Sequence, residues 1–310
     1  MQFLYWIESW RQPFLDQLML LVTELGGAAV FVVVALSVYW CVDKYLAYYM
    51  LSAGLAGMLT NQFLKLSCAV PRPWELDAQF GIVEAARADA TGYSWPSGHT
   101  QNAVTLFLAP AIYMQRRLLY ILALVGVLLV GCSRIYLGVH TPFDVLGALL
   151  VGAAVVGGLA VWLLPLPQRA RRCFMLWAGL LLLSVVFLLY IELFPHERAS
   201  AQELVLAAEN AWLLVGMLSG LLIGAVLEQR YVHFSTQACL WLQIVKTVPG
   251  LLLVVLILKG LPDLLLLCGL PLGPAEALGY LAAVIFAIAL WPRSFVLWQR
   301  LDKRADQHNA

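Results

Sequence analysis

Residues 118–164 read LLYILALVGVLLVGCSRIYLGVHTPFDVLGALLVGAAVVGGLAVWLL. The stretch contains two apolar runs, 118–134 and 141–164, and a membrane-spanning helix needs about 20 mostly apolar residues, or somewhat fewer where protein covers its ends. One arginine, one histidine and one aspartate interrupt the hydrophobic pattern, and all three lie where the two runs meet. The pattern predicts two membrane helices joined by a short connection that carries polar side chains.

The composition of the whole chain agrees with a membrane protein. Hydrophobic residues make up 62% of the 310 residues and charged residues 12%, and the mean hydropathy is +0.84. Soluble proteins average roughly 45–50% apolar and about 25% charged residues, so this composition excludes a soluble globular protein. A net charge of +1 excludes a nucleic-acid partner, because phosphate-backbone binding requires a concentrated basic surface. The expected partners are membrane lipids.

Nine apolar runs along the chain are long enough to be spans: 18–41, 45–64, 100–115, 118–134, 141–164, 173–194, 211–227, 239–259 and 276–297. They predict an all-α polytopic membrane bundle of about nine transmembrane helices. The first five spans are expected to form a core over residues 1–165 that includes an aromatic interfacial segment at the N-terminus. The remaining four form a C-terminal transmembrane extension over 166–310.

The basic residues predict the orientation, because Lys and Arg accumulate in cytoplasmic connections. One side of the nine-span layout collects Lys44, Arg116, Arg117, Arg169, Arg171, Arg172, Arg230, Arg300, Lys303 and Arg304. We therefore expect a cytoplasmic C-terminus and an N-terminus outside a plasma (inner) membrane. The long connection 65–99 then faces the periplasm, the exterior or a lumen.

Three polar clusters lie at the outer ends of the predicted core spans. They are Lys65 to Arg72-Pro73, Pro96-Ser97-Gly98-His99, and Ser133-Arg134 to His140 and Asp144. Placing ionisable groups at this depth in a membrane costs free energy unless they are paired or bind a ligand. Their cationic character indicates an anion with several oxygen atoms.

Phosphate fits these clusters for separate physical reasons. Arg72 and Arg134 offer planar forks that match phosphate oxygens, and Lys65 adds a mobile point charge. Ser97 and Gly98 lie at the predicted N-terminus of the third span, where free N–H groups and the helix dipole favour an anion. The sequence therefore predicts a phosphate-binding site that uses these five residues.

Two histidines and an aspartate supply the expected catalytic groups. Asp144 follows His140 by four residues, so its carboxylate would fix the imidazole tautomer and leave the other ring nitrogen free to attack phosphorus. His140 is the predicted nucleophile, forming a phosphohistidine, and His99 is the predicted acid and base for the leaving oxygen and for water. Because arginine and lysine provide the positive charge, no metal and no other cofactor is expected.

The three clusters resemble the three motifs of the type-2 phosphatidic acid phosphatase family. Lys-x6-Arg-Pro is met by residues 65–73, Pro-Ser-Gly-His by 96–99, and Ser-Arg-x5-His-x3-Asp by 133–144. The resemblance covers roughly residues 15–165 and implies a metal-independent phosphatase of the membrane-bound acid phosphatase type, with the roles given above. The nine-span layout is similar to the glucose-6-phosphatase branch of that superfamily.

The leading hypothesis is an integral-membrane phosphatase that hydrolyses a lipid phosphate or pyrophosphate at the outer face. A lipid phosphotransferase and a sugar phosphatase of the glucose-6-phosphatase type remain alternatives within enzyme chemistry. An anion transporter is the rival from another class, and it would need neither the pair of His140 and Asp144 nor a second histidine. Tyr93, Ser94 and Trp95 are interpreted as part of an interfacial aromatic belt, with substrate contact as the alternative.

Overall fold

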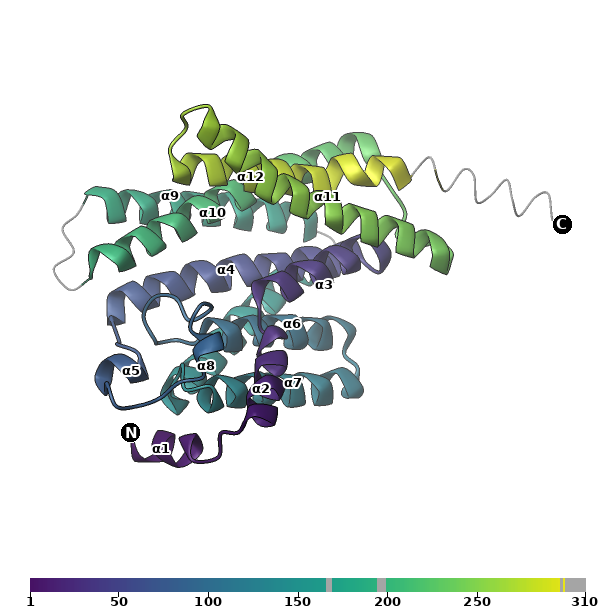
Figure 1. The fold of residues 1–310 in the computed structure, drawn as a ribbon. Coiled ribbons are helices and arrows are strands. Elements are labelled where there is room, and N and C mark those ends of the chain that lie inside the picture. The colour runs from purple at the N-terminus through teal and green to yellow at the C-terminus, as the bar shows by residue number, and fades with distance from the viewer. Residues whose placement is uncertain (166–168, 194–198, 296–297, 299–310) are drawn as a thin grey trace. The chain divides into compact units, whose positions relative to one another are not determined.

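The computed structural model describes residues 1–165, 169–193, 199–295 and 298, and within these residues the chain forms helices and no strand. In the N-terminal half the helices are α1 (Gln2–Glu8), α2 (Pro13–Glu24), α3 (Ala28–Cys41), α4 (Lys44–Cys68), α5 (Pro73–Leu76), η1 (Glu84–Ala86), α6 (Gly98–Met114), α7 (Arg117–Tyr136) and α8 (Pro142–Leu163). After these come α9 (Arg169–Leu193), α10 (Ala201–Leu227), η2 (Glu228–Val232), α11 (Leu240–Leu267), α12 (Leu272–Ile285) and η3 (Phe286–Leu290). The predicted all-α class is confirmed (Figure 1).

Six of the described helical segments are long and apolar enough to cross a membrane, or seven if α2 and α3 count as one bent span. The two remaining predicted spans correspond to α4 and α6. Although α4 has 25 residues, its sequence contains several polar side chains, and α6 has only 17 residues. The chain is therefore an integral membrane protein of several spans, and the count of nine stays a prediction.

The first predicted span is broken in the structure. The axes of α2 and α3 differ by 43°, and Gly26 lies at the break. A Cβ atom at Gly26 would lie 2.5 Å from the carbonyl oxygen of His99 and 2.8 Å from Val130. Glycine therefore allows this bend to pack directly against the start of α6.

Helices α6, α7 and α8 form the centre of the first compact unit, in which α6 packs against both other helices and α2 packs against α7 (Figure 1). This unit comprises residues 1–34, 49–169 and 190–208. Two capped helix starts bring polar residues together at one end of it. Ser97 caps α6 by accepting a hydrogen bond from the backbone of Thr100, and Thr141 caps α8, where Pro142 occupies the first turn.

The second compact unit comprises residues 35–48, 170–189 and 209–310. Within it, α11 packs against α12. The buried Tyr39 hydroxyl donates to the carbonyl of Ile288 at 3.0 Å, and the indole of Trp40 donates to Ala287 at 2.9 Å. Both acceptors lie in the π-helical turn η3, whose displaced carbonyls are thereby satisfied.

The two compact units each combine segments from before and after residue 165. The predicted division into residues 1–165 and 166–310 therefore stays a prediction. Of the basic residues that predict the orientation, Arg300, Lys303 and Arg304 lie outside the described residues.

Candidate active site

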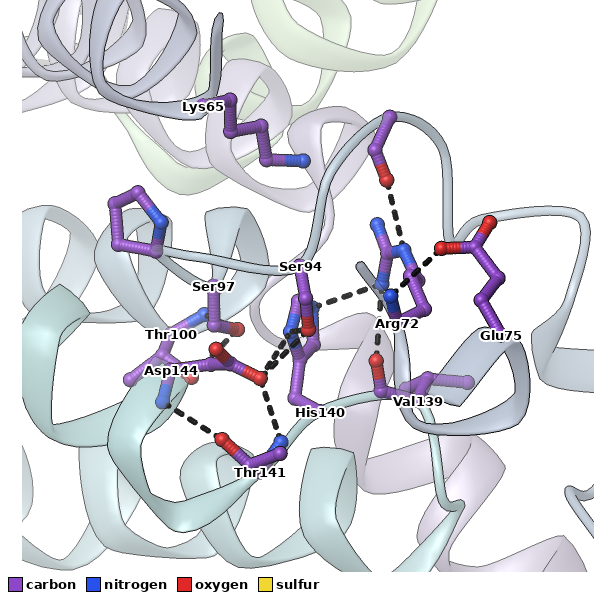
Figure 2. A network of polar contacts seen from close by, with 12 residues as sticks. Lys65, Arg72, Glu75, Ser94, Ser97, Thr100, Val139, His140, Thr141 and Asp144 are labelled. Atoms are coloured by element: carbon purple, nitrogen blue, oxygen red, sulfur yellow. Dashed lines mark hydrogen bonds and ion pairs between the residues drawn. The ribbon is translucent and has the colours of Figure 1, made fainter. Parts of the chain in front are cut away.

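The connection between α7 and α8 brings His140 next to Asp144 (Figure 2). Thr141 and Asp144 form a capping box: the Thr141 hydroxyl accepts from the backbone of Asp144 at 3.2 Å, and the Asp144 carboxylate accepts from the backbone of Thr141 at 2.6 Å. His140 Nδ1 then lies 3.5 Å from Asp144 Oδ2. The predicted pair is therefore formed, and the helix cap rather than the first turn of the helix brings its members together.

A single oxygen of Asp144 is shared by several donors. Besides the backbone of Thr141 and the ring of His140, the hydroxyl of Ser94 donates to Oδ2 at 2.7 Å. Ser94 and Asp144 are both buried, and a buried carboxylate requires such partners. This network fixes the carboxylate behind the imidazole.

Arg72 closes the other side of the imidazole ring (Figure 2). Its Nη1 lies 3.3 Å from His140 Nε2 and 3.0 Å from the carbonyl of Val139. A guanidinium group only donates hydrogen bonds, so Nε2 is the acceptor and the ring proton lies on Nδ1, facing Asp144. The nitrogen with the free electron pair thus points toward the guanidinium group of Arg72.

The protonation state of His140 agrees with this tautomer. Burial, the largest cause, lowers the pKa of His140 well below its ordinary value of 6.5, and the positive charges of Arg72 and Arg134 lower this pKa further. The hydrogen bond to Asp144 acts in the opposite direction. The imidazole is therefore neutral near pH 7, as a nucleophile must be.

Arg134 is fully buried near the end of α7, with a relative accessibility of 0%. Its Nη1 donates to the hydroxyl of Thr23 at 3.0 Å. Among the described residues, its Nε and Nη2 have no hydrogen-bond partner. Two unpaired, adjacent N–H groups of a buried guanidinium match two oxygens of a phosphoryl group.

The second motif supplies the start of α6. The backbone N–H of Ser97 donates to the carbonyl of Asp144 at 3.1 Å, which joins the two helix starts. A Cβ atom built on Gly98 would meet only Asn61 Oδ1, at 4.0 Å, so the helix N-terminus is open beside Gly98. His99 interacts electrostatically with the cationic residues Arg134, Lys65 and Arg72. The predicted acid and base therefore belongs to the same site.

Lys65 reaches the site from the last turn of α4 (Figure 2). Its Nζ donates to the carbonyl of Thr91 at 2.9 Å, and Arg72 Nη2 donates to the same carbonyl at 2.7 Å. Arg72 Nε donates in addition to the carbonyl of Gly92 at 2.8 Å. Burial lowers the pKa of Arg72 to about 10, although Asp144 and other carboxylates oppose this, so the guanidinium is charged at neutral pH.

The structure thus brings together the eight predicted site residues, which are Lys65, Arg72, Ser97, Gly98, His99, Arg134, His140 and Asp144. Sequence reasoning missed the roles of Ser94, Thr23 and Asn61. Asn61 donates to the carbonyl of Pro96 at 3.1 Å and to Gln101 at 2.9 Å, so it supports the turn before α6. Proximity to the second motif is the one local signal for Ser94, and no pattern marks Thr23 or Asn61. In the described part of the chain, no group of three His, Cys, Asp or Glu side chains is placed to hold a metal ion.

The chain is similar to a family of known proteins. Residues 45–172 match the PAP2 superfamily model, and residues 212–304 match the PAP2 superfamily phosphatase, transmembrane extension. Undecaprenyl-diphosphatase BcrC of Bacillus subtilis (strain 168) is 33% identical over 154 residues, which are 49% of this chain and 76% of that protein. Phosphatidylglycerophosphatase B of the same organism is 30% identical over 155 residues, which are 46% of this chain and 72% of that protein.

A human relative and the solved structures complete the comparison. Sphingosine-1-phosphate phosphatase 2 of Homo sapiens is 28% identical over 124 residues, which cover 38% of this chain and 30% of that protein. No solved structure matches the chain. The two family matches and the two bacterial relatives show that this membrane protein belongs to the PAP2 superfamily of phosphatases.

Proposed function

We propose that this protein hydrolyses a lipid phosphate or pyrophosphate at the outer face of the membrane, through a phosphohistidine on His140. The single observation that carries the proposal is the orientation of this imidazole. Its Nδ1 lies 3.5 Å from Asp144, and its Nε2 faces Arg72. This is the arrangement that a nucleophilic imidazole requires for attack on a bound phosphoryl group.

The reaction has two displacement steps at phosphorus. In the first, the Nε2 electron pair of His140 forms a bond to phosphorus while the bond to the leaving oxygen breaks. The imidazolium form of His99, which the negative charge of the bound phosphate stabilises, donates a proton to that oxygen. In the second, His99 removes a proton from water, the water oxygen bonds to phosphorus, and the P–N bond breaks. Inorganic phosphate leaves, and both histidines return to their starting states.

Charge stabilisation comes from groups that are already in place before the substrate arrives. Arg134 presents its Nε and Nη2 without partners in the described structure, and the N-terminus of α6 is open at Gly98. Lys65 and Arg72 add positive charge, and they exchange a backbone carbonyl oxygen for a phosphate oxygen when substrate binds. Preorganised donors of this kind usually make the largest contribution to phosphoryl transfer.

A lipid substrate is supported by the depth of the site and by the names of the relatives. Lys65 ends α4, Arg134 ends α7, and His99 and His140 lie at the starts of α6 and α8, so the site occupies one end of the core helices. An apolar tail that remains among lipid chains contributes about 0.8 kcal/mol per buried CH₂ group. The relatives include an undecaprenyl-diphosphatase and a phosphatidylglycerophosphatase.

The substrate proposal is tested by measuring phosphate release by the purified protein. The panel contains undecaprenyl pyrophosphate, phosphatidic acid, phosphatidylglycerophosphate and glucose 6-phosphate in the same detergent. We expect kcat/KM for at least one lipid to exceed that for glucose 6-phosphate by well over tenfold. Equal values, or a preference for the sugar, would overturn the lipid assignment and leave the phosphatase chemistry intact.

The phosphohistidine is tested by acid-sensitive labelling. Protein mixed with a ³²P-labelled substrate and quenched with base within milliseconds should carry label that base preserves and acid removes. His140→Ala should carry none and should lose at least several orders of magnitude in turnover. Label on the His140→Ala protein, or near-normal turnover by it, would refute the mechanism.

The orientation is tested by labelling introduced cysteines in a background without native cysteines. An impermeant thiol reagent added to intact cells should modify a cysteine at Ala88, in the connection 65–99. The reagent should not modify a cysteine at Gln115, between α6 and α7, until the membrane is opened. The reverse result would place the site on the cytoplasmic side.

A further inference from the structure

Glu203 brings a negative charge to the cationic site from outside the three motifs. It lies in the first turn of α10, and residues 190–208 belong to the same compact unit as the site. A Cβ atom at Gly92 would lie 3.3 Å from Glu203 Oε2 and 3.7 Å from Lys65 Nζ. The carboxylate and the ammonium group therefore flank the same glycine and lie within about 7 Å of each other, where charges interact appreciably in a partly buried site.

The carboxylate is held in this place by the segment 91–94. The backbone of Tyr93 donates a hydrogen bond to Glu203. The neighbouring carbonyls of Thr91 and Gly92 accept from Lys65 and Arg72. One short segment thus binds both the cationic side chains and the carboxylate that faces them.

Electrostatic attraction links Glu203 to two of the cationic side chains of the site. Glu203 interacts favourably with both Lys65 and Arg72. Residue 203 lies between the two family matches, which end at residue 172 and begin at residue 212. The motif resemblance therefore gives Glu203 no role.

We propose that Glu203 is a positioning residue that limits the affinity of the site for phosphate. The inference rests on the proposed function, because it takes the cluster of Lys65, Arg72 and Arg134 as the phosphate site. The negative charge of Glu203 offsets part of the positive charge that attracts the phosphoryl group. It thereby weakens the binding of the product, inorganic phosphate, and promotes its release.

The sign and size of the effect follow from Coulomb interactions. Phosphate bound beside Lys65 is repelled by the Glu203 carboxylate, so removing that charge strengthens phosphate binding. At separations of several Å and with partial solvent screening, we expect binding to tighten about three- to tenfold. A purely structural role of Glu203 would have the opposite effect, because a disordered segment 91–94 would release Lys65 and Arg72.

The test measures the affinity of the purified full-length protein for inorganic phosphate by isothermal titration calorimetry at pH 6, where a lysine ammonium group remains charged. Vanadate inhibition provides a second measurement. Glu203→Gln removes the charge but keeps an acceptor for the backbone of Tyr93, Glu203→Asp keeps the charge, and Glu203→Ala removes both. Glu192→Gln is the matched control, because this exposed carboxylate lies in α9.

Glu203→Gln should bind phosphate and vanadate about three- to tenfold more tightly than wild type, while Glu203→Asp and Glu192→Gln stay within twofold of it. Unchanged or weaker binding by Glu203→Gln would overturn the proposal. If this variant does not fold, Glu203→Ala decides, because it makes the same change in charge. Calorimetry measures phosphate binding without turnover, so the two proposals can fail separately. A wild-type protein that binds phosphate but hydrolyses no lipid would refute the proposed function, and the measured phosphate affinities of the variants would still test the role of Glu203.

Discussion

Replacing Arg134 with lysine tests whether the two unpaired donors of this guanidinium bind the reacting phosphoryl group. Lysine keeps the positive charge, but it does not present two N–H groups in a fixed planar fork. In the structure, Nη1 of Arg134 is bound to Thr23, whereas Nε and Nη2 have no partner among the described residues. The substitution therefore acts mainly on the pair of donors that we assign to the phosphoryl group.

The size of the effect follows from the number of hydrogen bonds. Each hydrogen bond to a charged group contributes about 1.5–3 kcal/mol, so two of them contribute about 3–6 kcal/mol to transition-state binding. Because each 1.36 kcal/mol corresponds to a factor of ten in rate, complete loss lowers kcat/KM by roughly 10²–10⁴. Arg134→Lys retains one mobile donor, so we expect a fall of about 10²-fold.

The assay is steady-state phosphate release from the preferred lipid substrate in detergent, with protein folding checked by the thermal transition of tryptophan fluorescence. Arg87→Lys is the control, because Arg87 lies in the connection 65–99, is exposed, and pairs with Glu84. It should stay within twofold of wild type. A folded Arg134→Lys protein with kcat/KM within threefold of wild type would refute the assignment of these donors to the phosphoryl group.

Three further substitutions or conditions probe the same site. Ser94→Ala removes a 2.7 Å hydrogen bond to the buried Asp144 carboxylate and should destabilise the protein by about 1.5–3 kcal/mol. The midpoint of thermal unfolding should fall, and an unchanged midpoint would contradict the hydrogen-bond network around Asp144. Because burial lowers the pKa of His140, its neutral form persists as the pH falls, and the acid limb of the kcat/KM profile should lie below pH 6.5. A fall in kcat/KM that depends on His140 and begins above pH 6.5 would contradict this prediction. Gly26→Ala should lower turnover by displacing the start of α6, whereas Gly157→Ala, whose Cβ meets no atom within 4 Å, should not; equal activities would exclude the close approach at Gly26.

The motif residues were predictable because their spacing depends on local geometry. Thr141 and Asp144 are three residues apart, and a capping box at that spacing depends on local backbone geometry and not on distant parts of the chain. The start of α6 after Ser97 follows in the same way from a capping residue before an apolar run. Sequence reasoning therefore found His99, His140 and Asp144 together with their helix ends.

The supporting residues were not predictable, because they are joined to the site only by tertiary packing. Thr23 and Arg134 are separated by 111 residues, and Ser94 and Asp144 by 50. Their hydrogen bonds depend on the bend between α2 and α3 and on the path of the connection 65–99, and neither leaves a periodic pattern in the sequence. The same limit applies to Glu203, whose place beside Gly92 depends on the packing of the start of α10.

The number of spans illustrates a different limit. Hydrophobic runs locate helices that face lipid, but helices enclosed by protein carry polar side chains or are shorter. α4 contains buried Ser52 and Asn61, and α6 contains buried Gln101 and Thr105. Buried polar side chains lower the mean hydropathy of α4 and α6, and the number of membrane spans is counted from this hydropathy.

The shared oxygen of Asp144 ties the assembly of the protein to its activity. The atom that accepts from the backbone at the start of α8 also faces the proposed nucleophile. If α8 does not begin at Thr141, the Asp144 oxygen does not orient the imidazole of His140. A misfolded protein is therefore expected to be inactive. Few other side chains can replace Asp144, because one oxygen atom must both accept the hydrogen bond from the backbone of Thr141 and face the imidazole of His140.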